Sequence, residues 1–361
     1  METGIVGLPL SGKTTLFNLL TRSGAQTGFA AGKKAVNLGV SRVPDPRVDR
    51  LSEIWRPRKT TPATIHYVDV AGVERSAEGE GLSPETLAHL KNTDALLVVV
   101  RAFDSQRVPH PEGSVDPLRD LGALHTEFLL SDLIIVESRL ERIAKQAKGR
   151  ADRDLAREKE VLERCRAILE ADRPLRDAEL KPDKEKVIRG FQFLTLKPLV
   201  IVVNLGEDDM ARAEEIVAPV RERWEGSNAV TVGLCATVEQ EISELAPDDA
   251  RAFLDDLGIA TPATDRIIRA TYELLGLISF LTMGEDECRA WTIRRGTTAA
   301  GAAGTIHTDL ERGFIRAEVV SYEDFVEAGT LAACRERGLL RLEGRDYVVQ
   351  DGDILNIRFN V

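Results

Sequence analysis

The chain has 361 residues and a formal net charge of −11, with 43% hydrophobic and 30% charged residues. This balance is typical of a globular protein with room for two domains, and it argues against a generally basic nucleic-acid-binding protein. No apolar run reaches membrane-spanning length, no signal peptide precedes the first strand, and the four cysteines are far apart without metal-site spacing. We expect a cytoplasmic protein with reduced thiols, no membrane partner and no sequence-specific DNA target.

The first motif lies between a short β-like apolar run at 4–6 and a run with helical apolar spacing at 15–20. It reads G-x-x-x-x-G-K-[ST] and consists of Gly7, Leu8, Pro9, Leu10, Ser11, Gly12, Lys13, Thr14 and Thr15. In such a P-loop the glycines allow close approach to a phosphate, and backbone N–H groups face the anion. We predict that Lys13 contacts the β- and γ-phosphates and that Thr14 binds Mg²⁺. An ordinary glycine-rich turn is the less favoured alternative.

An acidic residue ends the next strong strand pattern, at 64–70. Asp69 opens the sequence Asp69-Val70-Ala71-Gly72, a D-x-x-G element. Downstream of a P-loop, the Asp of this element holds Mg²⁺, here expected through water, and the Gly72 N–H meets the γ-phosphate. The Gly- and Glu-rich segment 73–81 fits a switch loop ordered by that phosphate, and residues 21–34 are expected to form a mobile loop.

Continuous apolar runs at 95–100, 199–203 and 229–234 predict strands that are buried on both faces of a parallel sheet. Because these strands alternate with helical patterns, we predict a doubly wound α/β P-loop domain over residues 1–277. The pattern then changes to short β-like runs. They lie at 289–293, 314–320, 347–349 and 354–359, with a helical pattern at 328–336 and a turn signal at 351–353. We expect a separate small α+β domain over residues 278–361.

A helical hairpin is predicted inside the first domain, at about 126–190. Apolar residues of its first helix repeat every three or four positions, which is typical of a coiled-coil seam. They are Leu129, Leu133, Val136, Leu140, Ile143 and Ala147. Basic residues gather at the expected tip: Arg142, Lys145, Lys148, Arg150, Arg153 and Arg157. A solvated helix face is the simpler interpretation of this cluster, and a docking surface for RNA or a ribosome is the alternative.

Several stretches resemble the YchF subfamily of the Obg-type P-loop GTPases, whose eukaryotic members are called Obg-like ATPases. The resembling stretches outside the C-terminal domain are 37–40, 43–47, 79–82, 115–118 and 193–198. In the C-terminal domain, the stretches 289–293, 306–309, 313–318 and 349–353 look like the subfamily's TGS domain, a β-grasp module. The resemblance covers essentially the whole chain. It implies nucleotide binding, a helical hairpin, a TGS domain, and ribosome binding through the hairpin tip and the TGS domain.

The base-recognition element departs from ordinary GTPases, which use N-K-x-D to pair the guanine N–H donors. Here the matching stretch is Asn204-Leu205-Gly206-Glu207, at the end of a predicted strand. A glutamate is one methylene longer than aspartate, and a guanine site with unpaired polar groups loses affinity steeply. We predict that ATP binds at least as well as GTP, with Cys235 and Ala236 closing the site after the next strand. A simple turn at a strand end is the alternative.

Three residues make the rate of hydrolysis an open question. The resemblance places Leu10 where the subfamily has Asn, Lys33 where it has a Mg²⁺-binding Thr, and Val73 where Ras-type enzymes have a water-orienting Gln. His110 matches a histidine of the subfamily that could reach the site on loop closure, and a solvent-exposed loop histidine is the alternative. We expect a slow ATPase or GTPase. The other hypothesis is a nucleotide-gated scaffold with negligible turnover.

Overall fold

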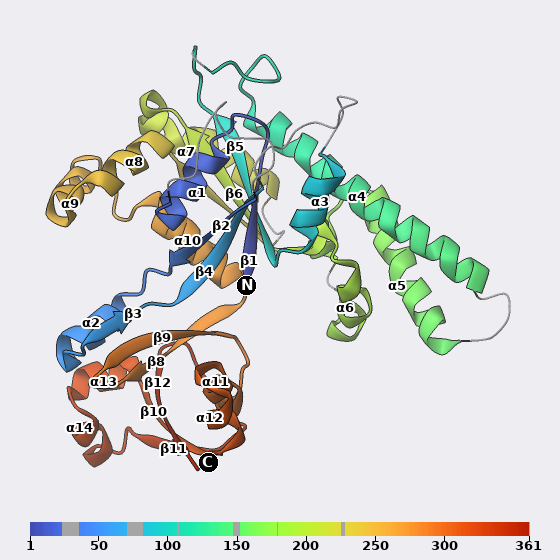
Figure 1. Ribbon diagram of the computed structural model, residues 1–361. Helices are drawn as coiled ribbons and strands as arrows, with labels where there is room; N and C mark the ends of the chain where they lie inside the picture. Colours follow the sequence, from blue (N-terminus) through green and yellow to red (C-terminus); the bar gives the residue numbers. More distant parts are fainter. Residues whose placement is uncertain are drawn as a thin grey trace. The chain divides into compact units, whose positions relative to one another are not determined.

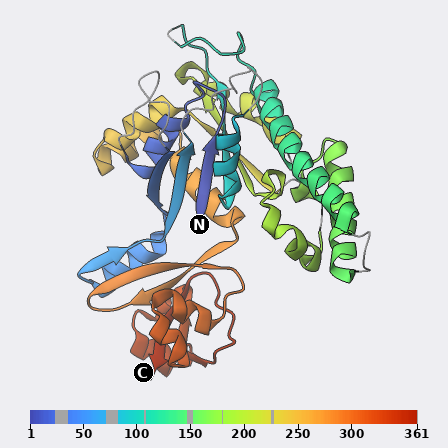
Figure 2. The same ribbon diagram turned by 45° about the vertical axis from the view of Figure 1, so that its right-hand side comes forward.

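The computed structural model divides the chain into two compact units, which Figures 1 and 2 show in two views. The residues that it describes are 1–23, 36–70, 82–106, 108–146, 152–178, 180–224 and 228–360. The first unit comprises Met1–Val40 and His66–Ala270, and the second comprises Ser41–Ile65 and Thr271–Val361. The expected division after residue 277 therefore missed an internal segment, Ser41–Ile65, that belongs with the C-terminal unit. None of the described helices is long and apolar enough to cross a membrane.

The first unit is built on a six-stranded sheet in the order β2-β4-β1-β5-β6-β7. The strands are β1 (Glu2–Val6), β2 (Val36–Arg42), β4 (Thr64–Val70), β5 (Ala95–Ala102), β6 (Leu199–Leu205) and β7 (Ala229–Leu234). Strands β4, β1, β5, β6 and β7 pair in parallel, so their carboxyl ends lie at one edge of the sheet. Every residue of β5 and β6 is buried, as their continuous apolar runs predict.

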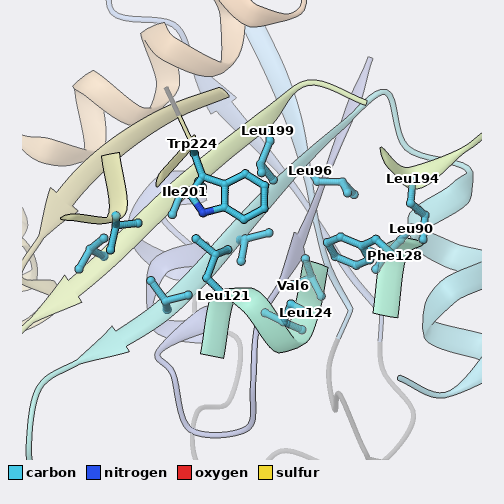
Figure 3. Packing of buried hydrophobic residues seen from close by; sticks show 14 of the residues in the cluster. Val6, Leu90, Leu96, Leu121, Leu124, Phe128, Leu194, Leu199, Ile201 and Trp224 are labelled. Carbon is cyan, nitrogen blue, oxygen red and sulfur yellow. The ribbon is translucent and has the colours of Figure 1, made fainter. Parts of the chain in front are cut away.

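Helices cover both faces of this sheet, which confirms the doubly wound α/β architecture (Figure 1). They are α1 (Lys13–Thr21), α3 (Pro84–Lys91), α4 (Pro117–Gln146), α7 (Ala213–Trp224), α8 (Ala236–Glu244), α9 (Pro247–Asp256) and α10 (Ala263–Leu274). Figure 3 shows the core on one face, where Leu90, Phe128 and Trp224 pack over Leu96 and Ile201. This packing fixes the sheet whose carboxyl edge carries the predicted site.

A helical hairpin extends from this sheet, as predicted (Figures 1 and 2). Its helices are α4 and α5 (Arg153–Glu170), followed by the short helix α6 (Pro182–Ile188). The hairpin has its own apolar core, in which Val136, Ile143, Val161 and Leu162 are fully or almost fully buried. The first helix begins at Pro117, before the expected residue 126, because α4 runs without a break from the sheet into the hairpin.

Asp132, near the base of the hairpin, accepts hydrogen bonds from the segment that precedes β6. Its Oδ1 accepts a hydrogen bond from Leu194 N at 2.9 Å. Its Oδ2 accepts from Thr195 N at 2.8 Å and from Thr195 Oγ1 at 2.7 Å. Burial raises the pKa of Asp132 to about 6, although these hydrogen bonds favour the carboxylate. Two segments far apart in sequence are thereby joined through one buried side chain.

The second unit is built on another six-stranded sheet, in the order β11-β10-β12-β8-β9-β3. The strands are β3 (Lys59–Thr61), β8 (Leu277–Met283), β9 (Glu287–Arg294), β10 (Phe314–Ser321), β11 (Arg341–Glu343) and β12 (Asp353–Phe359). The helices are α2 (Pro46–Trp55), α11 (Ala299–Ile306), α12 (Thr308–Arg312), α13 (Tyr322–Ala328) and α14 (Leu331–Glu336). Residues from α11 and α12 pack with β8, β9, β10 and β12 into one apolar core.

Two local predictions for the second unit are wrong. The predicted strand at 347–349 contributes only an isolated bridge, between Thr298 and Val348. The single helix predicted at 328–336 is instead the pair α13 and α14. They are separated at Gly329, whose φ of 77° is a left-handed conformation that ends α13.

Arg47 joins the segment Ser41–Ile65 to the C-terminal part of the second unit. Its guanidinium donates to Asp45 Oδ1 at 2.9 Å and to Asp351 Oδ2 at 2.8 Å. Asp351 Oδ1 also accepts from Ser279 N at 2.8 Å. The next residue, Gly352, has a φ of 86°, and a Cβ there would lie 2.7 Å from Arg47 Nη1. The left-handed φ therefore favours glycine here, and a side chain at this position would displace the Arg47 guanidinium from its ion pair.

Candidate nucleotide-binding site

The P-loop occupies the connection between β1 and α1, at the carboxyl edge of the first sheet. Gly12 precedes α1 with a φ of 98°, and it provides no side-chain cap to the first turn. The N–H groups of that turn therefore suit an anion. A Cβ on Gly12 would lie 2.4 Å from Asn204 Nδ2, and one on Gly7 would lie 2.3 Å from Val99 O. Both positions thus require glycine because their neighbours are too close for a side chain.

Lys13 is folded back onto the loop. Its ammonium donates to Leu8 O at 2.9 Å, and the same carbonyl accepts from Ser11 N at 3.3 Å. Burial lowers the pKa of Lys13 to about 8, and the negative charge of Asp69 only partly opposes that shift. Leu10 has a φ of 63°, a left-handed conformation that a leucine rarely adopts. The loop thus contains a desolvated cation at Lys13 and a backbone-strained residue at Leu10.

Thr14 and Asp69, both predicted as metal ligands, meet at this edge. The Thr14 hydroxyl donates to Asp69 Oδ2 at 2.9 Å, and Asn37 Nδ2 donates to the same oxygen at 3.4 Å. Asp69 is fully buried, and its Oδ1 has no hydrogen-bond partner within the described residues. An unpaired buried carboxylate oxygen is costly, and a hard cation would satisfy it. Sequence analysis assigned no role to Asn37, although it lies in one of the resembling stretches.

Asn204 connects the P-loop to the loop after β7. Its Nδ2 donates to Ser11 O at 3.0 Å, and its Oδ1 accepts from Ala236 N at 3.3 Å. Both amide atoms are thereby engaged with backbone groups. Glu207 is exposed at the start of the 3₁₀ helix η5 (Glu207–Arg212). Asn204 therefore fixes the position of these two loops relative to each other.

Two predicted contacts need correction. The side chain of Leu205 is only 3% exposed and packs in the core with Val203 and Ala102. Successive strand residues point to opposite faces, so Asn204 and Leu205 cannot both face the nucleotide. The Cys235 side chain is also buried, packed against Val238 and Ile242. The side chains of Leu205 and Cys235 therefore belong to the core.

His110 is buried in a pair with Asp120, which overturns the interpretation as an exposed loop residue. Its side chain is 4% exposed, and its Nε2 lies 2.9 Å from Asp120 Oδ2. Its Nδ1 accepts from Glu112 N at 3.1 Å. Arg119 also contacts Asp120, at 2.7 Å. A catalytic role for His110 would therefore require this pair to separate. The other predicted residues, Gly72, Lys33 and Val73, lie outside the described residues.

Arg101 is a buried cation near the site that sequence analysis did not single out. It lies beside Asn204 in the register of β5 and β6. Its Nε donates to Phe103 O at 3.0 Å and its Nη2 donates to Val108 O at 2.7 Å. Burial lowers the pKa of Arg101. Arg101 thus holds both ends of the loop that leads to His110. The sequence signal for this residue is the position of a single arginine directly after the long apolar run at 95–100.

The loop, the buried lysine and the acidic strand end come together at the carboxyl edge of a parallel sheet. This arrangement defines a P-loop nucleotide-binding protein. Residues 2–139 match the family described as "50S ribosome-binding GTPase". Residues 277–360 match YchF-GTPase_C, described as a protein of unknown function.

Similarity to known proteins identifies the family within the P-loop nucleotide-binding proteins. The chain is 42% identical to the "Ribosome-binding ATPase YchF" of Bacillus subtilis, over 100% of both chains. It is 44% identical to the Pasteurella multocida protein of the same name, over 100% of this chain and 99% of that one. It is 37% identical to "Obg-like ATPase 1" of rice, Oryza sativa, over 100% of this chain and 92% of the rice protein. The solved YchF GTPase of Schizosaccharomyces pombe has a TM-score of 0.89 and 33% identity, over 99% and 97% of the chains. The chain belongs to the YchF family.

Proposed function

We propose that this protein binds ATP at least as well as GTP, with Mg²⁺, hydrolyses it slowly, and associates with ribosomes in a nucleotide-dependent way. The observation that carries the proposal is the pair Thr14–Asp69, with its unpaired buried Oδ1, next to the buried ammonium of Lys13. The names of relatives at 42–44% identity support ribosome binding and ATP hydrolysis.

Each residue of the P-loop region has a distinct role in this proposal. Lys13 leaves Leu8 O and supplies a fixed positive charge to the β- and γ-phosphates. The Thr14 hydroxyl binds Mg²⁺, and Asp69 holds the ion through water. The Gly72 N–H meets the γ-phosphate. Bound Mg²⁺ supplies charge neutralisation at the phosphate oxygens, and these side chains position it.

In this proposal the base site disfavours guanine, because the glutamate at 207 is one methylene longer than the aspartate that pairs guanine. Glu207 has no ion pair or hydrogen bond within the described residues, so its carboxylate is available to the base. The cost of leaving guanine N–H groups badly paired falls on GTP alone. This argument supports the proposal that ATP binds at least as well as GTP.

Turnover is proposed to be slow in the isolated protein, well below the median enzyme rate of about 10 s⁻¹. His110 is paired with Asp120 and does not face solvent, so the resting arrangement does not present it to a phosphate. The second candidate, a nucleotide-gated scaffold with negligible hydrolysis, is favoured by the same observation and by Lys33 and Leu10. Single-turnover hydrolysis with and without ribosomes separates the two.

The hairpin tip is proposed as one ribosome contact. Arg142, Lys145 and Arg153 are exposed and have no ion pair within the described residues. Arg157 is paired with Asp183 at 2.5 Å, so its charge is partly neutralised. Lys148 and Arg150 lie outside the described residues. Three unpaired cations at the end of a hairpin support attraction to RNA phosphates.

The nucleotide part of the proposal is tested by calorimetric titration of ATP and GTP with and without Mg²⁺. Thr14→Ala should abolish the effect of Mg²⁺ on affinity, and Lys13→Ala should weaken binding with or without the ion. GTP binding tenfold tighter than ATP, about 1.4 kcal/mol, would contradict the proposed preference. Unchanged affinity and Mg²⁺ response in both variants would contradict the site itself.

The ribosome part is tested by co-sedimentation with purified ribosomes in the presence of ATP, ADP or no nucleotide. Reversing Arg142 and Arg153 to Glu should weaken sedimentation and reduce its dependence on salt. A matched control reverses Lys186 and Arg189, which are exposed on and just after α6. Nucleotide affinity should be the same in all variants. Equal sedimentation of the tip variant and the control would assign the tip to an ordinary solvated surface.

A further inference from the structure

Asp120, in the first turn of α4, is a buried carboxylate to which the proposed function assigns no role. Its side chain is 2% exposed, and both hydrogen bonds from the Arg119 guanidinium, at 3.0 and 2.7 Å, go to Oδ1. The other oxygen, Oδ2, lies 2.9 Å from His110 Nε2, but this contact lacks hydrogen-bond geometry. Within the described residues Oδ2 thus has no hydrogen-bond partner, and its contact with His110 can be exchanged without the loss of a hydrogen bond.

Arg101, the last residue but one of β5, is the complementary buried cation. It is 1% exposed and is the largest fully buried side chain among the described residues. Its Nε and Nη2 donate to the carbonyl oxygens of Phe103 and Val108. Its Nη1 is buried and has no hydrogen-bond partner in the part of the chain that the structure describes. Two of the five N–H donors of this guanidinium are therefore unpaired, which costs free energy in a buried position.

The segment 108–110 contacts both of these charges. Val108 O accepts from Arg101 Nη2 at 2.7 Å, and His110, two residues later, contacts Asp120. Burial lowers the pKa of Arg101, and the negative charges of Asp104 and Asp120 partly oppose that shift. Asp120 is therefore near enough for its charge to act on Arg101, although the described hydrogen bonds do not join the two side chains.

Withdrawal of the segment 108–110 would leave two buried groups of opposite charge without these contacts. Arg101 would lose Val108 O, and Asp120 would lose His110. A buried charge without a partner is strongly destabilising, whereas a buried ion pair regains part of the free energy lost on desolvation. The two groups can compensate each other, because Arg101 Nη1 has unused N–H donors and Asp120 Oδ2 is an unused acceptor.

We propose that Arg101 and Asp120 are positioning residues for ATP hydrolysis, and that they pair through Nη1 and Oδ2 when the segment 108–110 withdraws and His110 is released. This inference rests on the proposed function and on the prediction that His110 reaches the nucleotide. The new ion pair stabilises the arrangement in which His110 has left Asp120. It thereby raises the fraction of molecules in which His110 is available to the phosphates. Neither positioning residue touches the nucleotide.

A simple restraint of His110 by Asp120 makes the opposite prediction for one substitution. Asp120→Asn keeps an oxygen acceptor and nearly the same volume but removes the negative charge. If Asp120 only restrained His110, a weaker contact would release the histidine and hydrolysis would become faster. If the carboxylate pairs with Arg101 after the release, its neutralisation removes the ion pair and hydrolysis becomes slower.

The test measures single-turnover hydrolysis of ATP by the full-length protein and by Asp120→Asn. Asp116→Asn is the matched control: it makes the same chemical change just before α4, on an exposed carboxylate that accepts from Arg119 N at 3.0 Å and does not contact His110. Arg101→Gln and the double variant Arg101→Gln/Asp120→Asn complete a double-mutant cycle. ATP affinity by calorimetry and the melting temperature are measured for each variant.

Asp120→Asn should slow hydrolysis by about tenfold, with Asp116→Asn within about twofold of wild type and with ATP affinity and melting temperature unchanged in both. The double variant should be no slower than the slower single variant, because either substitution alone removes the ion pair. A rate of Asp120→Asn equal to that of Asp116→Asn, or faster than wild type, would overturn the inference, as would multiplying effects in the double variant. If Arg101→Gln does not fold, the comparison of the two Asn variants still decides.

The release of His110 is measured directly by its reaction with diethyl pyrocarbonate, followed by peptide mass spectrometry. The exposed side chain of His307 serves as the internal reference. His110 should react slowly in the nucleotide-free protein and faster with a non-hydrolysable ATP analogue and Mg²⁺, and Asp120→Asn should reduce this gain. Equal protection of His110 with and without the analogue would overturn the inference, whatever the rates.

The two measurements separate this inference from the proposed function. If wild type binds ATP but does not hydrolyse it, the proposed hydrolysis fails, and the labelling of His110 still decides whether the histidine leaves Asp120. If wild type hydrolyses ATP and His110→Ala is equally fast, the inference fails alone, because no histidine needs to be positioned. Nucleotide binding at the P-loop stands in both cases.

Discussion

The buried ammonium of Lys13 makes nucleotide affinity depend on pH in a direction that the structure specifies. In the nucleotide-free protein, burial lowers the pKa of Lys13 from 10.5 to about 8. A bound triphosphate places several negative charges against the same ammonium, which raises its pKa again. Above about pH 8, binding should therefore require the uptake of a proton.

The size of the effect follows from the shift. A difference of about 2.5 pKa units corresponds to about 3 kcal/mol at 1.36 kcal/mol per unit. Affinity for ATP should be nearly constant below about pH 8 and should fall by up to tenfold for each further pH unit. This is an upper limit because Lys13 regains only part of its solvation on binding.

The free energy of unfolding should change with pH in the direction opposite to the affinity for ATP. The folded pKa lies below the unfolded value, so between about pH 8 and 10.5 the unfolded chain binds more protons at this residue than the folded chain. The contribution of Lys13 to the free energy of unfolding therefore rises with pH across that window. Below pH 8 both states are protonated, and the cost of burying the ammonium is fully present.

The assay is calorimetric titration of ATP from about pH 7 to about pH 9.5, in buffers of different ionisation enthalpy. Wild type should take up close to one proton per ATP at the high end. Lys13→Met keeps the apolar stem without the charge, and it should bind weakly with no Lys-linked proton uptake. A wild-type affinity that is flat above pH 8, or an equal slope in the Met variant, would refute this reasoning.

Three further predictions concern single side chains. Leu10→Gly should raise the free energy of unfolding by about 1 kcal/mol in thermal melts, because glycine adopts the φ of 63° without strain; a loss of stability would contradict this. Asp132→Ala should cost about 3 kcal/mol or more in urea denaturation, since three buried donors lose their acceptor, with Asp132→Asn intermediate; a loss below 1 kcal/mol would show that water replaces the carboxylate. Glu207→Asp should shift competition binding towards GTP, and an unchanged ratio would place the selectivity elsewhere.

The nucleotide site was largely predictable because its determinants are local. The glycines at 7 and 12 have the characteristic spacing of a strand–loop–helix unit, although the atoms that leave no room for a side chain there, Val99 O and Asn204 Nδ2, belong to β5 and β6. Leu205 was misassigned because its neighbour in the motif is polar, whereas strand alternation turns its side chain into the core. The pairing of His110 with Asp120 joins a loop to a helix, and the residues between them gave no pattern that indicates it.

The membership of Ser41–Ile65 in the second unit could not be predicted for a different reason. Thr61 lies opposite Arg289 in the register of β3 and β9, and Arg47 bonds to Asp351. Both contacts join residues more than two hundred positions apart. Periodicity and motif spacing report local structure, so they carry no information about which distant strand a short edge strand will join.

This discontinuous second unit has a consequence for synthesis of the chain. Strand β3 and helix α2 leave the translating ribosome long before β9, which β3 pairs with. About 200 residues, 66–270, separate the two parts of the unit, and at 5–20 residues per second their synthesis takes roughly 10–40 s. During that time the apolar side chains of Val48 and Leu51, buried in the finished protein, have no second unit to pack against. The nascent chain must keep this segment from associating elsewhere until its C-terminal partner has been made.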